Sequence, residues 1–223
     1  MESNAQSYRH VIDISQVLDK LLAEKLVDAE TEVILANGEP TLYEYFDEIL
    51  LKVFRSNAKM HVRTNGLLFS NSLYNYLYSD KNSINISVDA GTKETYQKIK
   101  RINGFDRVWK NIKKYRETNG DVQVKYVVFS YNSNPKELEA FVEKCLEANI
   151  RHVVVSAELN ALHNHPNCPW EFGEREYKAI FYLNALCKKH NIHISSELYL
   201  SVEQQVKRYQ VLKDMMGSDD WQI

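Results

Sequence analysis

The chain has 223 residues, 44% of them hydrophobic and 26% charged, with 28 basic and 30 acidic side chains and a formal net charge of −2. This balance is typical of a globular domain, and it gives no broad electrostatic attraction to nucleic acid or to an anionic membrane. No run approaches the roughly 20 apolar residues of a membrane span, and the polar start lacks the apolar core of a signal peptide, so we expect a cytoplasmic protein.

Short apolar, β-branched runs alternate with longer amphipathic segments along the chain. The short runs predict strands, and the longer segments, which repeat apolar residues at helical spacing, predict helices. The first predicted helix covers residues 15–27. The predicted strands are 33–35, 60–63, 84–88, 122–129, 152–155 and 192–194.

Repeated strand-then-helix order calls for right-handed crossovers and a parallel sheet, either a TIM-type barrel or an open doubly wound sheet. In both folds, ligands bind at the carboxyl ends of the strands. The pattern opens with a helix, and the polar segment before it is a poor strand, so a first strand is missing from the pattern. With no linker or repeat, residues 1–223 are predicted to form one incomplete α/β domain.

Three helix starts carry local signals. Thr41 to Glu44 and Ser201 to Gln204 fit the capping-box pattern, in which two residues three apart satisfy each other's backbone N–H groups. Asn134 followed by Pro135 places a capping side chain before a proline in the first turn.

Turn-forming and polar residues follow the first three predicted strands. These are Asn37-Gly38-Glu39-Pro40, then Thr64-Asn65-Gly66, then the stretch from Ser87 through Asp89 to Thr92. A glycine permits close approach to the backbone, and a carboxylate can receive an ammonium group. Taken singly, each motif is also an ordinary turn between a strand and a helix.

Taken together and in order, these motifs resemble the radical S-adenosylmethionine (SAM) superfamily, nearest to the branch with peptide-modifying and SPASM-associated enzymes. Thr95 to Ile99 and Phe105 to Val108 add to the match, which covers about residues 15–160. The resemblance implies a partial TIM-type (β/α)6 barrel with parallel strands, and SAM as cofactor.

The resemblance also implies roles for individual residues. Gly38, Glu39 and Pro40 match the family's GGEP motif, which holds the amino group of SAM, and Asn37 stands at its first glycine. Asn65 belongs to the second family motif.

The later strands supply further implied contacts. Ser87 and Asp89 match positions that contact the ribose or the methionyl carboxylate in relatives, and Lys125 is expected to face the same carboxylate. Val155 and Ser156 fall where relatives pass the adenine, although the strand's parity is open by one residue.

The family binds a [4Fe-4S] cluster through three cysteines in a CxxxCxxC loop, and this sequence has no such motif. Cys145 and Cys187 are expected to be buried in helices as small hydrophobic residues. The expected cluster therefore has no ligands here, and we expect the chain alone not to cleave SAM.

Three explanations fit this gap: an internal fragment of a longer enzyme, a split gene product completed by another chain, or a degenerate relative kept for binding. The leading function is a radical SAM-type enzyme domain with the SAM-holding half of the site, acting on an unknown peptide or small molecule. The alternative is a cluster-free binding or scaffold protein. An ordinary TIM-type hydrolase or aldolase would need an acid-base pair or a reactive lysine, for which Lys125 is the one candidate.

Two further features bear on partners and metals. Without a preceding strand, the strand that ends near Ala36 would have an open edge, which favours pairing with a complementing chain or with itself. His163, His165 and Cys168 have ligand chemistry but lack a fourth ligand, so substrate contact is the better interpretation and no metal site is predicted.

Overall fold

The computed structural model describes residues 13–158, 174–197 and 201–216. Its strands form one parallel sheet in the order β1-β2-β3-β4-β5-β6. In a doubly wound sheet, the spatial order of the strands reverses at one point. The order here follows the chain without a break, which confirms the barrel-type alternative. The strands are β1 (Glu32–Leu35), β2 (Lys59–Thr64), β3 (Ser83–Ser87), β4 (Asp121–Val128), β5 (His152–Ala157) and β6 (His193–Ser196).

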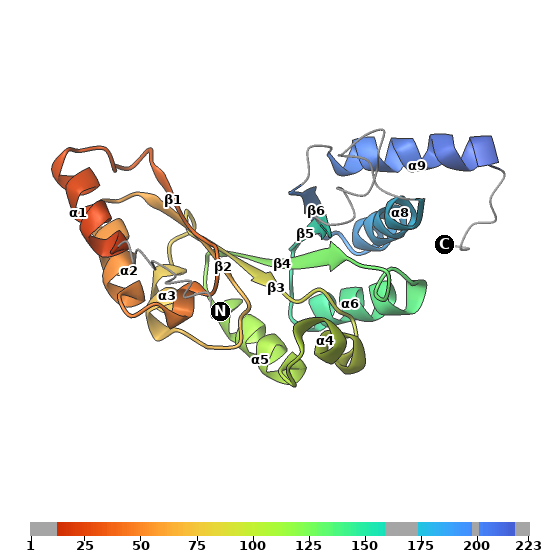
Figure 1. Ribbon diagram of the computed structural model, residues 1–223, viewed down its shortest axis with the longest axis horizontal. Helices are drawn as coiled ribbons and strands as arrows, with labels where there is room; N and C mark the ends of the chain where they lie inside the picture. The colour runs from red at the N-terminus through yellow and green to blue at the C-terminus, as the bar shows by residue number, and fades with distance from the viewer. Residues whose placement is uncertain (1–12, 159–173, 198–200, 217–223) are drawn as a thin grey trace, which may run out of the picture.

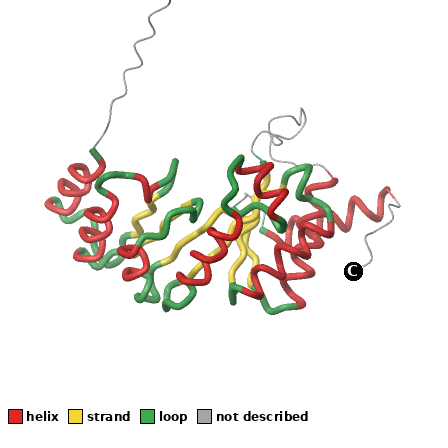
Figure 2. Tube along the Cα trace, turned by 90° about the horizontal axis from the view of Figure 1, so that it is seen from below, coloured by secondary structure: helices red, strands yellow, loops and turns green. Residues whose placement is uncertain are grey.

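Helices α1 to α3 gather at one end of the molecule, α4 to α6 lie below the middle of the sheet, and α8 and α9 lie at the other end (Figure 1). Turned by 90°, the strands run between these groups of helices (Figure 2). None of the described helices is both long and apolar enough to cross a membrane. The helices are α1 (Ile14–Ala23), the short 3-10 helix η1 (Pro40–Leu42), α2 (Phe46–Arg55), α3 (Asn71–Tyr76), α4 (Lys93–Lys100), α5 (Phe105–Tyr115), α6 (Pro135–Glu147), α8 (Glu174–Lys189) and α9 (Val202–Met216).

The sheet has one apolar and one polar face. In β2 to β5, every second residue, such as Val62, Ile84 and Val124, is buried in the core with the helices, while Val33, Leu35 and Ile194 of the edge strands are partly buried there. The residues between them point to the opposite face, because side chains alternate along a strand. A register row on that face runs across five strands: Arg63, Asn85, Gln123, His152 and His193.

Two of the three predicted helix starts are confirmed. The Asn134 side chain accepts a hydrogen bond from the N–H of Glu137 and caps α6, with Pro135 in the first turn. Ser201 and Gln204 make the reciprocal pair of a capping box at α9.

The capping box predicted at Thr41 is wrong. The capping residue is Glu39 instead. Its side chain accepts a hydrogen bond from the Thr41 N–H and caps η1, which ends after one turn. Helix α2 begins only at Phe46, and Tyr45, at the N-cap position before it, makes no side-chain hydrogen bond to the helix. The helix predicted over 15–27 is also shorter, because it ends at Ala23 and Lys25 adopts a left-handed conformation at φ 54°.

The described chain starts at residue 13, so the prediction about a first strand concerns residues outside the described part. Within the described part, β1 is an edge strand of the sheet and β6 is the other edge.

Candidate functional site

The turn after β1 leaves its backbone accessible. Asn37 and Gly38 both adopt the left-handed conformation, with φ of 71° and 77°. A Cβ atom added to Gly38 would meet no heavy atom within 4 Å, so the space beside this glycine is open. The backbone of the turn can therefore be approached closely by another group, which is the usual reason for a glycine at such a place.

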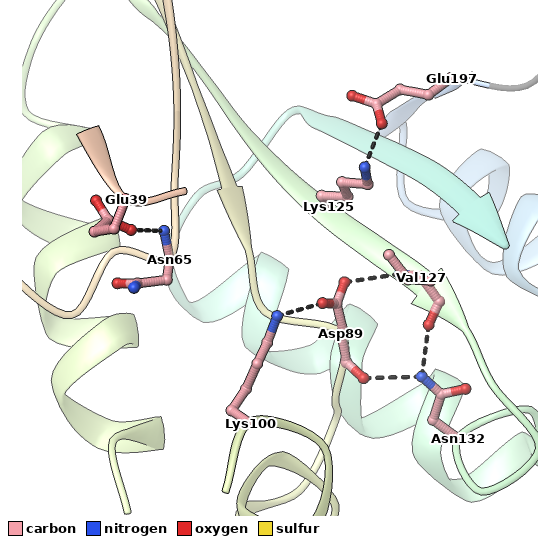
Figure 3. A network of polar contacts seen from close by, with 8 residues as sticks. All are labelled: Glu39, Asn65, Asp89, Lys100, Lys125, Val127, Asn132 and Glu197. Atoms are coloured by element: carbon pink, nitrogen blue, oxygen red, sulfur yellow. Dashed lines mark hydrogen bonds and ion pairs between the residues drawn. The ribbon is translucent and has the colours of Figure 1, made fainter. Parts of the chain in front are cut away.

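The carboxylate of Glu39 links this turn to the end of β2. Its Oε1 accepts hydrogen bonds from the Thr41 hydroxyl at 2.7 Å and from the Thr64 hydroxyl at 2.6 Å. Its Oε2 accepts a hydrogen bond from the Asn65 N–H at 2.7 Å. Since a carboxylate oxygen has about two acceptor positions, Oε2 keeps capacity for one more donor. The structure thus brings the predicted residues Glu39 and Asn65 together (Figure 3).

Asn65 serves mainly the turn that it begins. Its side-chain oxygen accepts from the Leu67 N–H at 2.9 Å, while its backbone N–H is the donor to Glu39. Gly66 follows at φ 70°, and a Cβ atom there would lie 2.6 Å from the Ile86 side chain, so the turn packs against the core. The Asn65 amide is therefore held at the strand end by local bonds.

Asp89 is a buried carboxylate, with 3% of its surface exposed. It accepts from the Lys100 ammonium at 2.5 Å and from the Val127 N–H at 2.8 Å. The Asn132 amide donates to the backbone oxygens of both Asp89 and Val127, which closes the network (Figure 3). Each carboxylate oxygen accepts one of these bonds, and together with the Asn132 bonds they hold the loop between β3 and α4.

Lys125 lies on the polar face next to Ser87, with which it is in register. Its ammonium group pairs with the carboxylate of Glu197, just after β6 (Figure 3). The other oxygen of Glu197 lies 3.5 Å from the Arg63 guanidinium, at the end of β2. One carboxylate, which sequence reasoning missed, therefore sits between two cations from distant strands.

Packing decides which residues of β5 face the core and which face the polar side of the sheet. Val153 and Val155 belong to the core, whereas Val154 does not, although it is only 4% exposed. Ser156 shares the face of Val154 and is in register with Val127 on β4. Of the two residues expected near an adenine, only Ser156 faces the polar side.

A second polar cluster on this face escaped sequence reasoning. The His152 Nδ1 lies 3.1 Å from an Asp121 carboxylate oxygen, and its Nε2 lies 2.8 Å from the Ser195 hydroxyl. The hydrogen bond with His152 holds the pKa of Asp121 below its usual value. The His193 ring meets His152 edge-on at 4.7 Å between centroids.

The signal for this polar face lies in the sequence as a period of two. Lys59, His61 and Arg63 alternate with apolar residues along β2, and Asp121, Gln123 and Lys125 do so along β4. Alternation of this kind indicates a strand with one buried and one polar face. The alternation therefore identifies the polar-facing residues of β2 and β4, whereas their alignment with β5 and β6 needs the register of the sheet.

The described cysteines are buried in helices, as predicted. Burial raises the pKa of Cys145 well above its ordinary value and that of Cys187 to about 12. Because metal clusters bind thiolates, neither thiol suits an iron ligand. Within the described residues, no group of three or more His, Cys, Asp or Glu side chains could hold a metal ion. The predicted loop residues His163, His165 and Cys168 lie outside the described part.

Residues 4–145 fit the family model described as "Radical SAM superfamily". Among curated proteins, "Molybdenum cofactor biosynthesis protein moc-5" of Caenorhabditis elegans is 31% identical over 135 residues, which are 60% of this chain and 22% of that protein. A "GTP 3',8-cyclase" of Haemophilus influenzae is 30% identical over 145 residues, or 63% of this chain and 41% of that protein. The chain thus spans less than half of the length of these relatives.

Solved structures share the fold at low sequence identity. Streptococcus suis SuiB bound to precursor peptide SuiA superposes with a TM-score of 0.61 and 17% identity, over 83% of this chain and 41% of that chain. A protein titled "Native anSMEcpe with bound AdoMet" gives a TM-score of 0.62 and 17% identity, over 82% of this chain and 53% of the other. These likenesses agree with a partial α/β barrel.

Proposed function

Because this chain belongs to the radical SAM superfamily, we propose that it forms the SAM-holding half of a radical SAM-type enzyme site. SAM and a [4Fe-4S] cluster are the cofactors of that family, and the polar ends of the strands are where this fold binds ligands. The proposal assigns SAM to the residues after β1, β2 and β3 and to the polar residues of β4 and β5.

One observation carries the proposal: a pocket lined by Asn37, Glu39 and Pro40 lies at the turn after β1, and the Glu39 carboxylate there has an acceptor position left. An ammonium group that entered this space could donate to Glu39 Oε2, which accepts only from the Asn65 N–H among the described residues. The proline that follows holds the turn, since Pro40 begins η1. These features suit the amino group of SAM.

Lys125 would hold the methionyl carboxylate, with Ser87 beside it in register. In the free protein the Lys125 ammonium is paired with Glu197. The ammonium has three donors, so a ligand carboxylate would share it with Glu197 or displace it, and in both cases Glu197 would compete with SAM for the same cation. On the neighbouring strand β5, Val154 is the register partner of Lys125, and Ser156 lies two residues further along. A purine could rest against the sheet at Ser156.

Asp89 would support the site by holding the loop after β3, without contacting SAM itself. Its carboxylate is shared between the Lys100 ammonium and the Val127 N–H. These bonds fix the loop that follows β3, and with it the orientation of Ser87. In this proposal, Asp89 supports the site without touching SAM.

The described cysteines do not fit the cluster, because both are buried with raised pKa values. The proposal therefore covers binding of SAM and no cleavage of it by these residues. A cluster would need thiolates from elsewhere, and we propose no radical step for this chain alone.

For the substrate we propose a polar molecule, either a nucleotide or a peptide. The face of the sheet that carries Lys125 has histidine, amide, hydroxyl and charged groups, with Val127 and Val154 among them. The curated relative of Haemophilus influenzae is named for GTP, and SuiB was solved with a precursor peptide.

Isothermal titration calorimetry with SAM tests the proposal. We expect the wild-type chain to bind, Glu39→Gln to weaken binding about tenfold or more, and the control Glu44→Gln, at an exposed site in the same turn, to bind as the wild type does. Glu197→Gln should strengthen binding because it releases Lys125. Wild-type protein that binds no SAM at millimolar ligand, while folded by circular dichroism, would refute the proposal.

The alternative is a cluster-free binding or scaffold protein built on the same barrel. The burial of Cys145 and Cys187 favours it, because the described chain offers no thiolate for iron. The same calorimetry separates the two functions, since the scaffold predicts no SAM binding and no response to Glu197→Gln.

A further inference from the structure

Three side chains on the polar face of the sheet form a chain of hydrogen bonds across neighbouring strands. Asp121 begins β4, His152 begins β5, and Ser195 lies within β6. An Asp121 carboxylate oxygen lies 3.1 Å from His152 Nδ1, and the Ser195 hydroxyl lies 2.8 Å from His152 Nε2. The imidazole therefore stands between a carboxylate and a hydroxyl, with one ring nitrogen facing each of them.

The register of the sheet explains why these three residues meet. Gln123 is the partner of His152 on β4, so Asp121 lies two residues before that position. His193 is the partner of His152 on β6, so Ser195 lies two residues beyond it. Because residues two apart share one face of a strand, the three side chains run diagonally over a single face of β4, β5 and β6.

The hydrogen bonds fix which nitrogen of His152 carries the proton. An ionised carboxylate only accepts hydrogen bonds, and the bond with His152 holds the pKa of Asp121 below its usual value. The proton of the neutral ring therefore sits on Nδ1, and Nε2 accepts the Ser195 O–H. A serine nucleophile needs this tautomer, since Nε2 must be free to take its proton.

Two neighbours hold the carboxylate and the ring in place. The Gln123 amide donates to the same Asp121 oxygen at 2.6 Å, and the His193 ring packs edge-on against His152. The side chains of Asp121 and His152 nevertheless remain 46% and 20% exposed. Since polar groups with this exposure can bond to water instead, burial alone does not require the arrangement.

We propose that Asp121, His152 and Ser195 act as a triad that hydrolyses carboxylic esters, an activity that does not rest on the proposed function. Ser195 is the nucleophile, His152 is the general base, and Asp121 is the positioning residue. The Lys125 ammonium reaches the carboxylate of Glu197, two residues beyond Ser195, which places positive charge near the strand of the nucleophile (Figure 3). Such a charge stabilises the negative oxygen of a tetrahedral intermediate.

The reaction uses only the ester, water and these side chains. The Ser195 Oγ attacks the carbonyl carbon, and its proton passes to His152 Nε2. The bond between the carbonyl carbon and the alkoxy oxygen then breaks, and the leaving alcohol takes the proton from Nε2. Water attacks the acyl group on Ser195, one water proton passes to Nε2 and then to the serine oxygen, and the carboxylic acid is released. Asp121 stays ionised and accepts the Nδ1 proton bond throughout.

A second serine and histidine on the same face provide an internal comparison. The Ser83 hydroxyl lies 2.7 Å from His61 Nδ1. Among the described residues, no carboxylate is hydrogen-bonded to His61, and burial lowers the pKa of this ring. His61 is therefore a weaker base with no acid to orient it, so Ser83 should be unreactive.

Labelling of the full chain with a fluorophosphonate probe, mapped by peptide mass spectrometry, tests the triad. The probe forms an O–P bond to an activated serine and releases fluoride. We expect label on Ser195 of the wild type and none on Ser83. His152→Gln should slow labelling about 100-fold or more, and the matched control Ser83→Ala should label as the wild type does. The wild-type result needs no variant, so it stands even if a variant fails to fold.

Hydrolysis of p-nitrophenyl acetate without SAM supplies the second measurement. Ser195→Ala removes one oxygen from a partly exposed side chain, so it should keep the circular dichroism spectrum and lose the esterase activity. Asp121→Asn should lower kcat about tenfold or more and leave KM unchanged, because the amide no longer enforces the tautomer. An unlabelled Ser195 in folded wild type, labelling insensitive to His152→Gln, or undiminished hydrolysis by Ser195→Ala would each overturn the proposal.

Discussion

Arg63 and Glu197 form an ion pair at 3.5 Å, although β3, β4 and β5 lie between the strand that carries Arg63 and the strand that precedes Glu197. A flat sheet would hold these ends far apart, since neighbouring strands are about 4.8 Å apart. The short distance therefore requires the sheet to curve, as in a partial barrel. Lys125, on the strand between them, shares the same carboxylate.

Replacing Glu197 with glutamine should lower the free energy of unfolding by about 1 kcal/mol, because two partly exposed ion pairs are lost and each is weakened by solvent. Urea denaturation of Glu197→Gln, Lys125→Gln and the double variant measures the coupling of this pair. We expect the double variant to cost less than the sum of the two single variants. Strictly additive costs would mean that the pair does not contribute to stability.

Replacing Glu137 with glutamine should cost more, about 2–3 kcal/mol, because one carboxylate oxygen becomes an NH2 group that cannot accept hydrogen bonds. Glu137 is 6% exposed and accepts from the hydroxyls of Thr92 and Thr95 at 2.6 and 2.7 Å and from the Gly91 N–H at 2.9 Å.

The exposed Glu143 on the same helix provides the control for this prediction. Its change to glutamine should stay within about 0.5 kcal/mol of the wild type in the same urea titration. Equal costs at the two positions would show that the bonds of Glu137 do not stabilise the fold.

Alanine should be tolerated at Gly38 and not at Gly91. A Cβ atom at Gly91 would lie 2.1 Å from the Glu137 backbone oxygen and 2.7 Å from the Phe141 nitrogen, so α6 would have to move. We expect Gly91→Ala to lose about 3 kcal/mol or to fail to fold. Gly38→Ala meets open space and should cost about 1 kcal/mol from its positive φ alone. Thermal unfolding compares them, and the reverse order would contradict the packing.

Stability should fall on acidification because of His61. Burial lowers the pKa of this side chain below its usual 6.5, and the charge of Arg63 lowers it further. The unfolded chain therefore takes up a proton near pH 6.5 that the folded chain takes up only at lower pH. The stabilising effect of neutral His61 is present above pH 6.5 and is lost as the pH falls through the folded pKa.

Urea denaturation between about pH 5 and pH 8, repeated with His61→Gln, measures this dependence. The variant should show a shallower loss of stability on acidification than the wild type. A direct NMR titration that placed the pKa of His61 above 6.5 would contradict the expected sign.

Much of the fold followed from local sequence patterns. The β-branched runs were strands because the parallel sheet buries one face of each of them, and Cys145 and Cys187 were buried because they lie on the apolar side of amphipathic helices. Asn134 and Ser201 capped helices as predicted, since a cap depends on residues only a few positions apart. The turn after β1 likewise kept the open glycine that its motif indicated.

Long-range contacts decided the rest. The amino-acid sequence by itself determined the alternation of elements, the family motifs and the identity of the side chains at the strand ends. Only the tertiary structure decided that Glu39 rather than Thr41 caps the turn, that Asp89 is held by Lys100, and that Glu197 reaches Lys125. The physical reason is that these partners depend on the curvature and register of the sheet, which emerge when segments distant in sequence pack together.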